Sequence, residues 1–232
     1  MKRCFFVLGL LLVVTSSAQA QVAGDDQPGF AFGSKVVATS RYIWRGFEDG
    51  GFSIQPSTWM QVGGFKATSW FNLAANPTER SSLTEQDVTA QYTRNFGTYA
   101  VTGGWNGYFF PSGYGHSHEA FVSVERAGPL TPSFAVYRDF RLGNGSYVNA
   151  GVAHAWPAFI PALGLSSTFN VGYNHHHWTD VRGFSDANVG LRATWQATRR
   201  VAIGPFVNHS RSLNRAIVPT HTYGGVELAV RR

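Results

Sequence analysis

The chain of 232 residues is 44% hydrophobic and 15% aromatic but only 14% charged, whereas soluble domains carry about 25% charged residues. Its 26 glycines suit crowded, twisted sheets and argue against a helical protein. The formal net charge of +6 is a modest basic excess, too small to indicate a nucleic-acid-binding protein by itself.

The first twenty residues predict a removable export signal. Lys2 and Arg3 form a positive start, residues 5–14 are an apolar stretch too short to span a bilayer, and Ala18-Gln19-Ala20 is a small-x-small cleavage site. Because Cys4 lies in this leader, we expect a mature chain without disulfides or cysteine metal ligands. For an exported chain, lipopolysaccharide or an anionic solute suits the basic excess better than nucleic acid.

Residues 21–34 are expected to form a flexible N-terminal tail, and residues 35–232 one domain. In that domain, stretches alternate with period two, as strands with a lipid face and an aqueous face require. They lie near 35–46, 52–62, 65–74, 85–95, 98–110, 118–126, 132–141, 146–156, 163–174, 186–195, 200–209 and 221–230. The pattern predicts an all-β protein, a transmembrane antiparallel β-barrel of about twelve strands, with roughly ten to fourteen compatible.

The connectors between these stretches alternate in length. Tight turns are expected at 62–64, 95–97, 127–129, 156–161 and 196–198, and longer polar loops at 75–86, 111–117, 175–185 and 210–220. Short periplasmic turns and long outer loops are typical of outer-membrane barrels. We therefore expect a monomer in a bacterial outer membrane, in contact with lipid and lipopolysaccharide and folded by the barrel-assembly machinery.

Aromatic residues near the strand ends are candidates for the girdles that such barrels place at headgroup level. They are Tyr42, Trp44, Trp59, Trp105, Trp156 and Trp195. The alternative for each is packing in the core of a soluble β-sandwich.

Charged residues are expected inside the barrel, because a charge on the lipid face costs about 2–4 kcal/mol at the bilayer midplane. The alternation assigns to the lumen Arg41, Arg45, Asp87, Glu119, Glu125, Asp139, Arg192 and Glu227. They form either a selectivity constriction for polar or anionic solutes or a network of ion pairs that fills the interior.

Most of the histidines fall in the expected outer loops or strand tops, which raises the question of a metal site or a pH-sensitive gate. The candidate ligands are His116, His118, His175 and His177. Neither a cysteine nor an ordered set of carboxylates accompanies them, so a hydrophilic rim is the favoured interpretation. No cofactor is expected.

The segment Ser40-Arg41-Tyr42-Ile43-Trp44-Arg45-Gly46 resembles the S-x-Y-x-x-R-G opening of the Gcw_chp-type family of predicted outer-membrane barrels. Further matches are Glu85-Gln86-Asp87 with Tyr92, residues 104–111, Glu119 with Phe121, Tyr137-Arg138-Asp139, and Tyr147 with Gly151. The chain departs from the family in having Phe109 and Phe110 where tyrosine is usual, and in ending with Arg231-Arg232 instead of an aromatic residue. The resemblance implies a barrel of this size without an established substrate.

An enzymatic function is not expected. Neighbouring residues of a strand point to opposite faces, so His209 cannot serve Ser210 as a base. The leading hypothesis is a narrow passive channel for small polar or anionic solutes. The alternatives are a structural or surface-binding barrel, with lipopolysaccharide, metal or another partner as ligand, and a soluble secreted β-sandwich.

Overall fold

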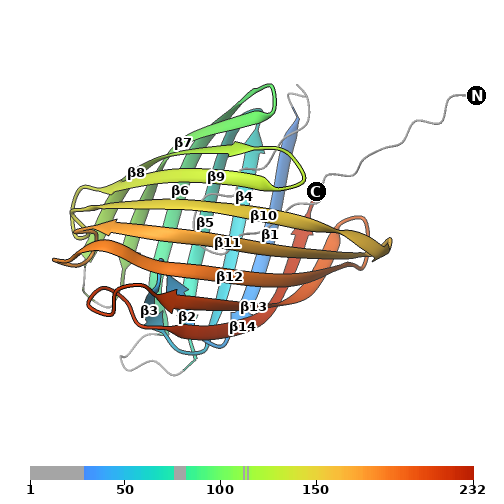
Figure 1. Cartoon of the computed structure of the whole chain (residues 1–232). Helices are drawn as coiled ribbons and strands as arrows, with labels where there is room; N and C mark the ends of the chain where they lie inside the picture. The colour runs from blue at the N-terminus through green and yellow to red at the C-terminus, as the bar shows by residue number, and fades with distance from the viewer. Residues whose placement is uncertain (1–28, 76–81, 112, 114) are drawn as a thin grey trace, which may run out of the picture.

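The computed structural model describes residues 29–75, 82–111, 113 and 115–232. In this part of the chain, twelve strands close into one antiparallel barrel, and β1 pairs with β14 to complete the wall (Figure 1). The wall strands are β1 (Phe30–Thr39), β4 (Ser53–Val62), β5 (Phe65–Ala74), β6 (Leu83–Phe96), β7 (Tyr99–Phe110), β8 (Gly115–Arg126), β9 (Thr131–Asp139), β10 (Ser146–Ile160), β11 (Leu163–His175), β12 (Arg182–Gln196), β13 (Val201–Ser212) and β14 (His221–Arg231). The predicted twelve-strand barrel is confirmed.

The two faces of the wall differ as the alternation predicts. In β7, Thr102, Asn106 and Tyr108 are buried inside the barrel, whereas Tyr99 and Trp105 are exposed on the outer face. The outer face of the other strands is likewise rich in exposed valine, leucine and phenylalanine. Such an apolar outer wall around a polar interior is the pattern of a barrel whose solvent is lipid.

The two ends of the barrel carry different connections. At one end, which we call the turn end, the connections are short, such as Gly63-Gly64 between β4 and β5. At the other, the loop end, they are mostly longer, such as residues 176–181 and 213–220. The predicted alternation of short and longer connections between successive strands is therefore confirmed. No helix among the described residues is long and apolar enough to cross a bilayer.

The N-terminal part of the wall corrects the sequence prediction at both of its boundaries. The first strand begins at Phe30, so residues 30–34, expected in the tail, belong to the barrel. It ends at Thr39, so residues 40–46, expected in the same strand, leave the wall. The predicted export signal lies outside the described residues.

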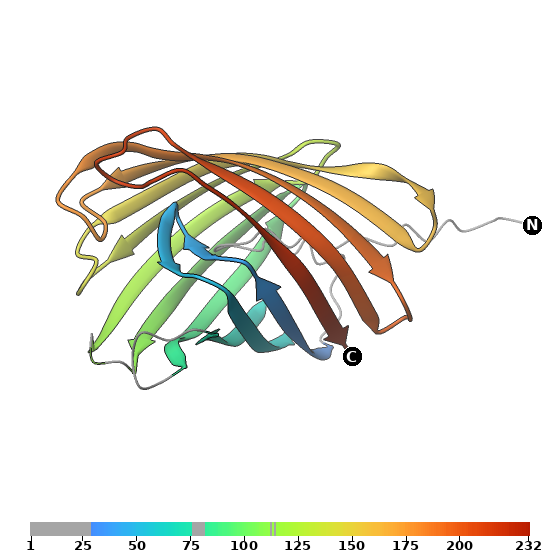
Figure 2. The same cartoon turned by 90° about the horizontal axis from the view of Figure 1, so that it is seen from below.

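The segment that leaves the wall folds into a hairpin of β2 (Tyr42–Trp44) and β3 (Phe47–Gly50). At its tip Arg45 has φ 50° and Gly46 φ 84°, and positive φ at both central residues is the hairpin turn that matches strand twist. Figure 2 shows this hairpin, in blue, within the space that the wall strands enclose. Thr39 of β1 pairs with Ser53 of β4. The wall is therefore continuous between these two strands up to the point where the hairpin leaves it.

Half of the predicted girdle is confirmed as outward-facing. Trp105, Trp156 and Trp195 are exposed on the outer wall. Trp59 instead faces the interior, where the Lys66 ammonium lies 5.0 Å from its ring. Tyr42 and Trp44 belong to the inserted hairpin. For these three residues the girdle assignment was wrong.

Candidate functional site in the barrel lumen

The tip of the hairpin is held by a buried ion pair. Arg45 Nη1 donates to Glu119 Oε2 at 2.6 Å, and Nη2 donates to Oε1 at 2.8 Å. Arg45 is 3% exposed and Glu119, from β8, is fully buried. This bidentate geometry matches a planar guanidinium to a carboxylate and is both strong and directional.

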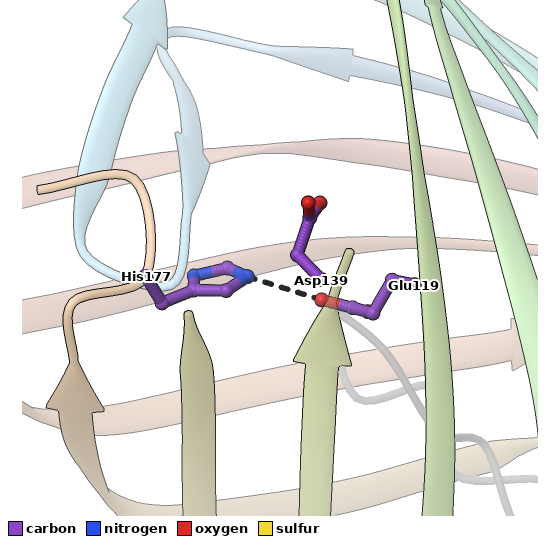
Figure 3. Close-up of side chains that lie close together, drawn as sticks. All are labelled: Glu119, Asp139 and His177. Carbon is purple, nitrogen blue, oxygen red and sulfur yellow. Dashed lines mark hydrogen bonds and ion pairs between the residues drawn. The ribbon is translucent and has the colours of Figure 1, made fainter. Parts of the chain in front are cut away.

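Other groups complete the environment of the Glu119 carboxylate. Asn106 Nδ2 and Tyr108 Oη, both from β7, donate to Oε1 at 3.0 and 2.9 Å. His177 Nε2 lies 3.1 Å from Oε2 and comes from the loop between β11 and β12 (Figure 3). Asn174 fixes that loop, because its side chain accepts from the His177 backbone N–H and donates to the His177 carbonyl. The site thus joins the hairpin, the wall and a loop.

Aromatic rings surround the Arg45 guanidinium. Its carbon lies 4.0 Å from the ring of Tyr137, 4.5 Å from Trp44 and 5.0 Å from Tyr147. Cation–π attraction is strongest where water is excluded, as it is around these buried tyrosines. The hairpin tip is therefore stabilised on several sides.

The far side of the tip touches β12 and the loop before β14. A Cβ on Gly46 would lie 3.0 Å from Val218 and 3.2 Å from Asp186. Asp186 in turn accepts from Tyr147 Oη at 3.3 Å. The hairpin therefore crosses the lumen from its origin beside β1 to the opposite wall, near the loop end.

Glu119, Asp139 and His177 are the described residues whose donor atoms come close enough to suggest a metal site, all lying within 4.8 Å of one another. Asp139 Oδ1, however, accepts from Ser117 Oγ and from the backbone N–H groups of the following turn. Both oxygens of Glu119 accept from Arg45. The carboxylate oxygens thus already accept from hydrogen-bond donors of the protein, and the Arg45 guanidinium is the cation that this site holds.

The histidines do not assemble as the metal hypothesis required. His116 and His118 lie on the outer side of β8, and their rings contact each other and the outer aromatic residues. His175 is exposed at the end of β11, whereas His177 is buried in the lumen. The four predicted ligands therefore do not share one site.

Of the predicted lumen residues, the structure brings together Arg45 with Glu119, and Arg192 with Glu227. Arg192 Nη1 donates to Glu227 Oε2 at 2.8 Å, nearer the turn end. Lys35, which the sequence analysis missed although it alternates into the lumen, lies 3.7 Å from the same oxygen. This second cluster mixes both signs of charge.

The remaining predicted lumen residues take no part in these two ion pairs, although Asp139 lies close to Glu119. Arg41 pairs with Glu48 on the hairpin and not on the wall, which corrects its assignment to the first strand. Asp87 lines the larger cavity, Glu125 lines the smaller one, and Asp139 closes the β9–β10 turn.

Two cavities lie against the hairpin. The larger, of about 250 Å³, is lined by Tyr42, Ile43 and Trp44 of the hairpin and by polar and aromatic residues of the wall, of which Lys35, Lys66 and Asp87 are ionisable. The smaller, of about 80 Å³, touches Ile43 and Arg45 and is lined largely by asparagine, serine, threonine and glycine of β8 to β13. The lumen beside the hairpin is thus hollow and polar.

His177 responds to this environment. Burial lowers the pKa of His177 from its ordinary value of 6.5; the hydrogen bond to Glu119 opposes this shift and the positive charge of Arg45 adds to it. The lowered pKa favours the uncharged imidazole, whose Nε2 lies 3.1 Å from Glu119 Oε2 and 3.0 Å from Arg45 Nη1. We call the contact set of Arg45, Glu119 and His177 the anchor; it contains one ion pair and one imidazole ring.

An apolar outer wall, a polar lumen and a closed antiparallel sheet define a β-barrel of the porin type. Solved structures that share this fold are a KdgM porin (10% identity, TM-score 0.54, 86% of this chain and 98% of that one), a NanC porin (8%, 0.56, 87% and 99%) and an outer membrane channel from Pseudomonas putida F1 (8%, 0.54, 90% and 97%). No family model matches the chain, and no curated protein matches it. At these identities the similarity establishes the fold alone.

Proposed function

We propose that this protein is an outer-membrane channel that admits small polar solutes passively and is narrowed at its loop end by the β2–β3 hairpin. The observation that carries the proposal is the anchored hairpin tip, Arg45 on Glu119, lying across a polar lumen. A plain structural barrel has no need of a loop that is drawn inward and tied to three parts of the wall. The loop end is then extracellular and the turn end periplasmic.

The solved porins support this class of function. One of them is described as a KdgM porin in complex with disordered oligogalacturonate, over 87% of this chain at TM-score 0.53. In the present lumen, Lys66 and the Arg192–Glu227 cluster offer groups that would contact a polar or anionic solute. We propose no catalysis, since His209 is exposed and Ser210 buried on opposite faces of β13.

Membership of the Gcw_chp-type family remains our proposal, and the anchor supports it. Five of the residues that carry the resemblance lie together around the hairpin tip, namely Arg45, Gly46, Glu119, Tyr137 and Tyr147. If the family shares such an inserted hairpin, its shared residues are expected to contact one another at the hairpin tip, as these residues do.

Conductance of the refolded mature chain in planar bilayers tests the channel directly. In the decisive variant, a two-residue Asn-Gly turn replaces the hairpin between Thr39 and Ser53, which already pair. We expect small conductance steps from the wild type and clearly larger steps from the shortened variant. Insertion of both proteins without any conductance would favour the structural or surface-binding barrel, and equal steps would show that the hairpin does not limit passage.

A further inference from the structure

We propose that the outer wall at the loop end of β8 and β9 binds the phosphate groups of lipopolysaccharide. The site, which we call the outer basic patch, consists of His116, His118, Arg138 and Arg141. It rests on the outer-membrane location proposed above, because that location places the patch in the outer leaflet.

The members of the patch lie next to one another. Arg141 Nη1 contacts His116 Nε2, and the rings of His116 and His118 are 5.1 Å apart. Arg138 belongs to β9, where its neighbour in register is Ala120 of β8. Both arginines are exposed, and Arg138 Nη2 lies 3.5 Å from Asn144 Oδ1.

Aromatic side chains adjoin the patch on the outer wall of the barrel. The ring of His118 stacks on Trp105 at 5.5 Å, and that of His116 on Phe109 at 6.3 Å. Phe140, next to Arg141 in the chain, is 63% exposed. Tryptophan is enriched at the level of the headgroups, so Trp105 is consistent with a patch at that depth. A ligand here would meet cationic groups and an apolar surface together, which suits a phosphorylated lipid better than a free anion.

Carboxylates do not neutralise this surface. Glu119 and Asp139, adjacent in sequence to His118 and Arg138, point into the lumen and are fully buried. Among the described residues, the carboxylates other than Asp180 lie on the hairpin or on inward positions of the wall. They are Glu48, Asp49, Glu85, Asp87, Glu119, Glu125, Asp139, Asp186 and Glu227. In the same part of the chain no ion pair involves Arg138 or Arg141. The positive charge of the patch is therefore available to an external phosphate.

The test measures binding of diphosphoryl lipid A to the folded mature protein in neutral detergent micelles by native mass spectrometry. The variants are R138Q/R141Q and, as a matched control, R199Q/R200Q, which removes the same charge from the turn end. We expect the patch variant to bind lipid A about tenfold more weakly than the wild type, since each arginine near an anionic lipid surface contributes substantially, and the control to bind as the wild type does.

Three outcomes would overturn the proposal: equal binding by wild type and R138Q/R141Q, equal binding of lipid A stripped of its phosphates, or binding of phosphatidylglycerol as tight as that of lipid A. Heat-modified migration in gels verifies that each variant is folded. Conductance in bilayers of phospholipid alone is recorded in parallel. If the barrel binds lipid A but does not conduct, the channel proposal is refuted and the lipid-binding proposal stands. If the barrel conducts but does not bind lipid A, the channel proposal stands and the lipid-binding proposal is refuted.

Discussion

Arg45 and Glu119, separated by 74 positions in the chain, form a bidentate ion pair that ties an inserted hairpin to the opposite side of the barrel. A buried pair of this kind repays its desolvation only when the geometry is good and the remaining hydrogen-bonding positions are filled. Asn106, Tyr108 and His177 fill them here. The pair therefore determines where the hairpin lies more than it adds to global stability.

Removal of the acidic partner should release the hairpin. In Glu119→Gln the guanidinium of Arg45 stays buried without a counter-charge, which costs about 3–5 kcal/mol, so we expect lower stability in urea and larger conductance steps. Glu48→Gln is the control, because it removes a carboxylate that is exposed and contacts Arg41 and, at 3.6 Å, His221, and it should cost less than about 1 kcal/mol. Unchanged steps in Glu119→Gln would contradict the anchor.

Gly46→Ala should weaken the turn itself. The residue has φ 84° and its added Cβ would press on Val218 and Asp186; a left-handed alanine alone costs about 1–2 kcal/mol. We expect noisier and larger conductance steps. Gly51→Ala, where a Cβ meets nothing within 4 Å, should behave like the wild type, and similar behaviour of the two variants would count against a tight turn.

Acid should loosen the anchor through His177. Because burial lowers the pKa of His177 in the closed arrangement, proton uptake favours the arrangement in which the ring is hydrated. The closed state is thus fully stable above the ordinary value of 6.5 and loses stability as the pH falls below it. Beside His177 lie Arg45, Glu119 and Asp139. We expect conductance to rise in acid, and His177→Gln to flatten that dependence.

The cluster nearer the turn end should set ion preference. Arg192→Gln leaves Glu227 with Lys35 alone, so the reversal potential in a salt gradient should move toward cation selectivity. Glu227→Gln leaves Arg192 and Lys35 without a carboxylate and should move it toward anion selectivity. Shifts in the same direction, or none, would place the selectivity filter elsewhere.

The alternation of the strands was readable from the sequence because it is a local property. Residues two positions apart in a strand lie on the same face of the sheet. Because a charge facing lipid is costly, the face that carries the charged residues is the one that faces the lumen. The sequence alone therefore predicted which charged side chains point inward, among them those of Asp87, Glu119, Asp139, Arg192 and Glu227. The parity of turns and loops followed by the same reasoning.

The hairpin was not readable in this way. The alternation of Arg41, Ile43 and Arg45 continues that of β1, so a local pattern cannot distinguish a strand that stays in the wall from one that turns inward. The available signals were Gly46 beside Arg45, and Asp49-Gly50 at the end of the hairpin, which are residues of tight turns.

By itself the sequence determined a barrel with a lipid face, a polar interior and long loops at one end. The tertiary structure alone decided that one loop enters the lumen, and that Arg45 meets Glu119 and His177, the latter two lying 58 positions apart. Such contacts depend on how twelve strands close and which loop ends reach one another across the lumen. Periodicity along one strand carries no information on distances across a closed sheet.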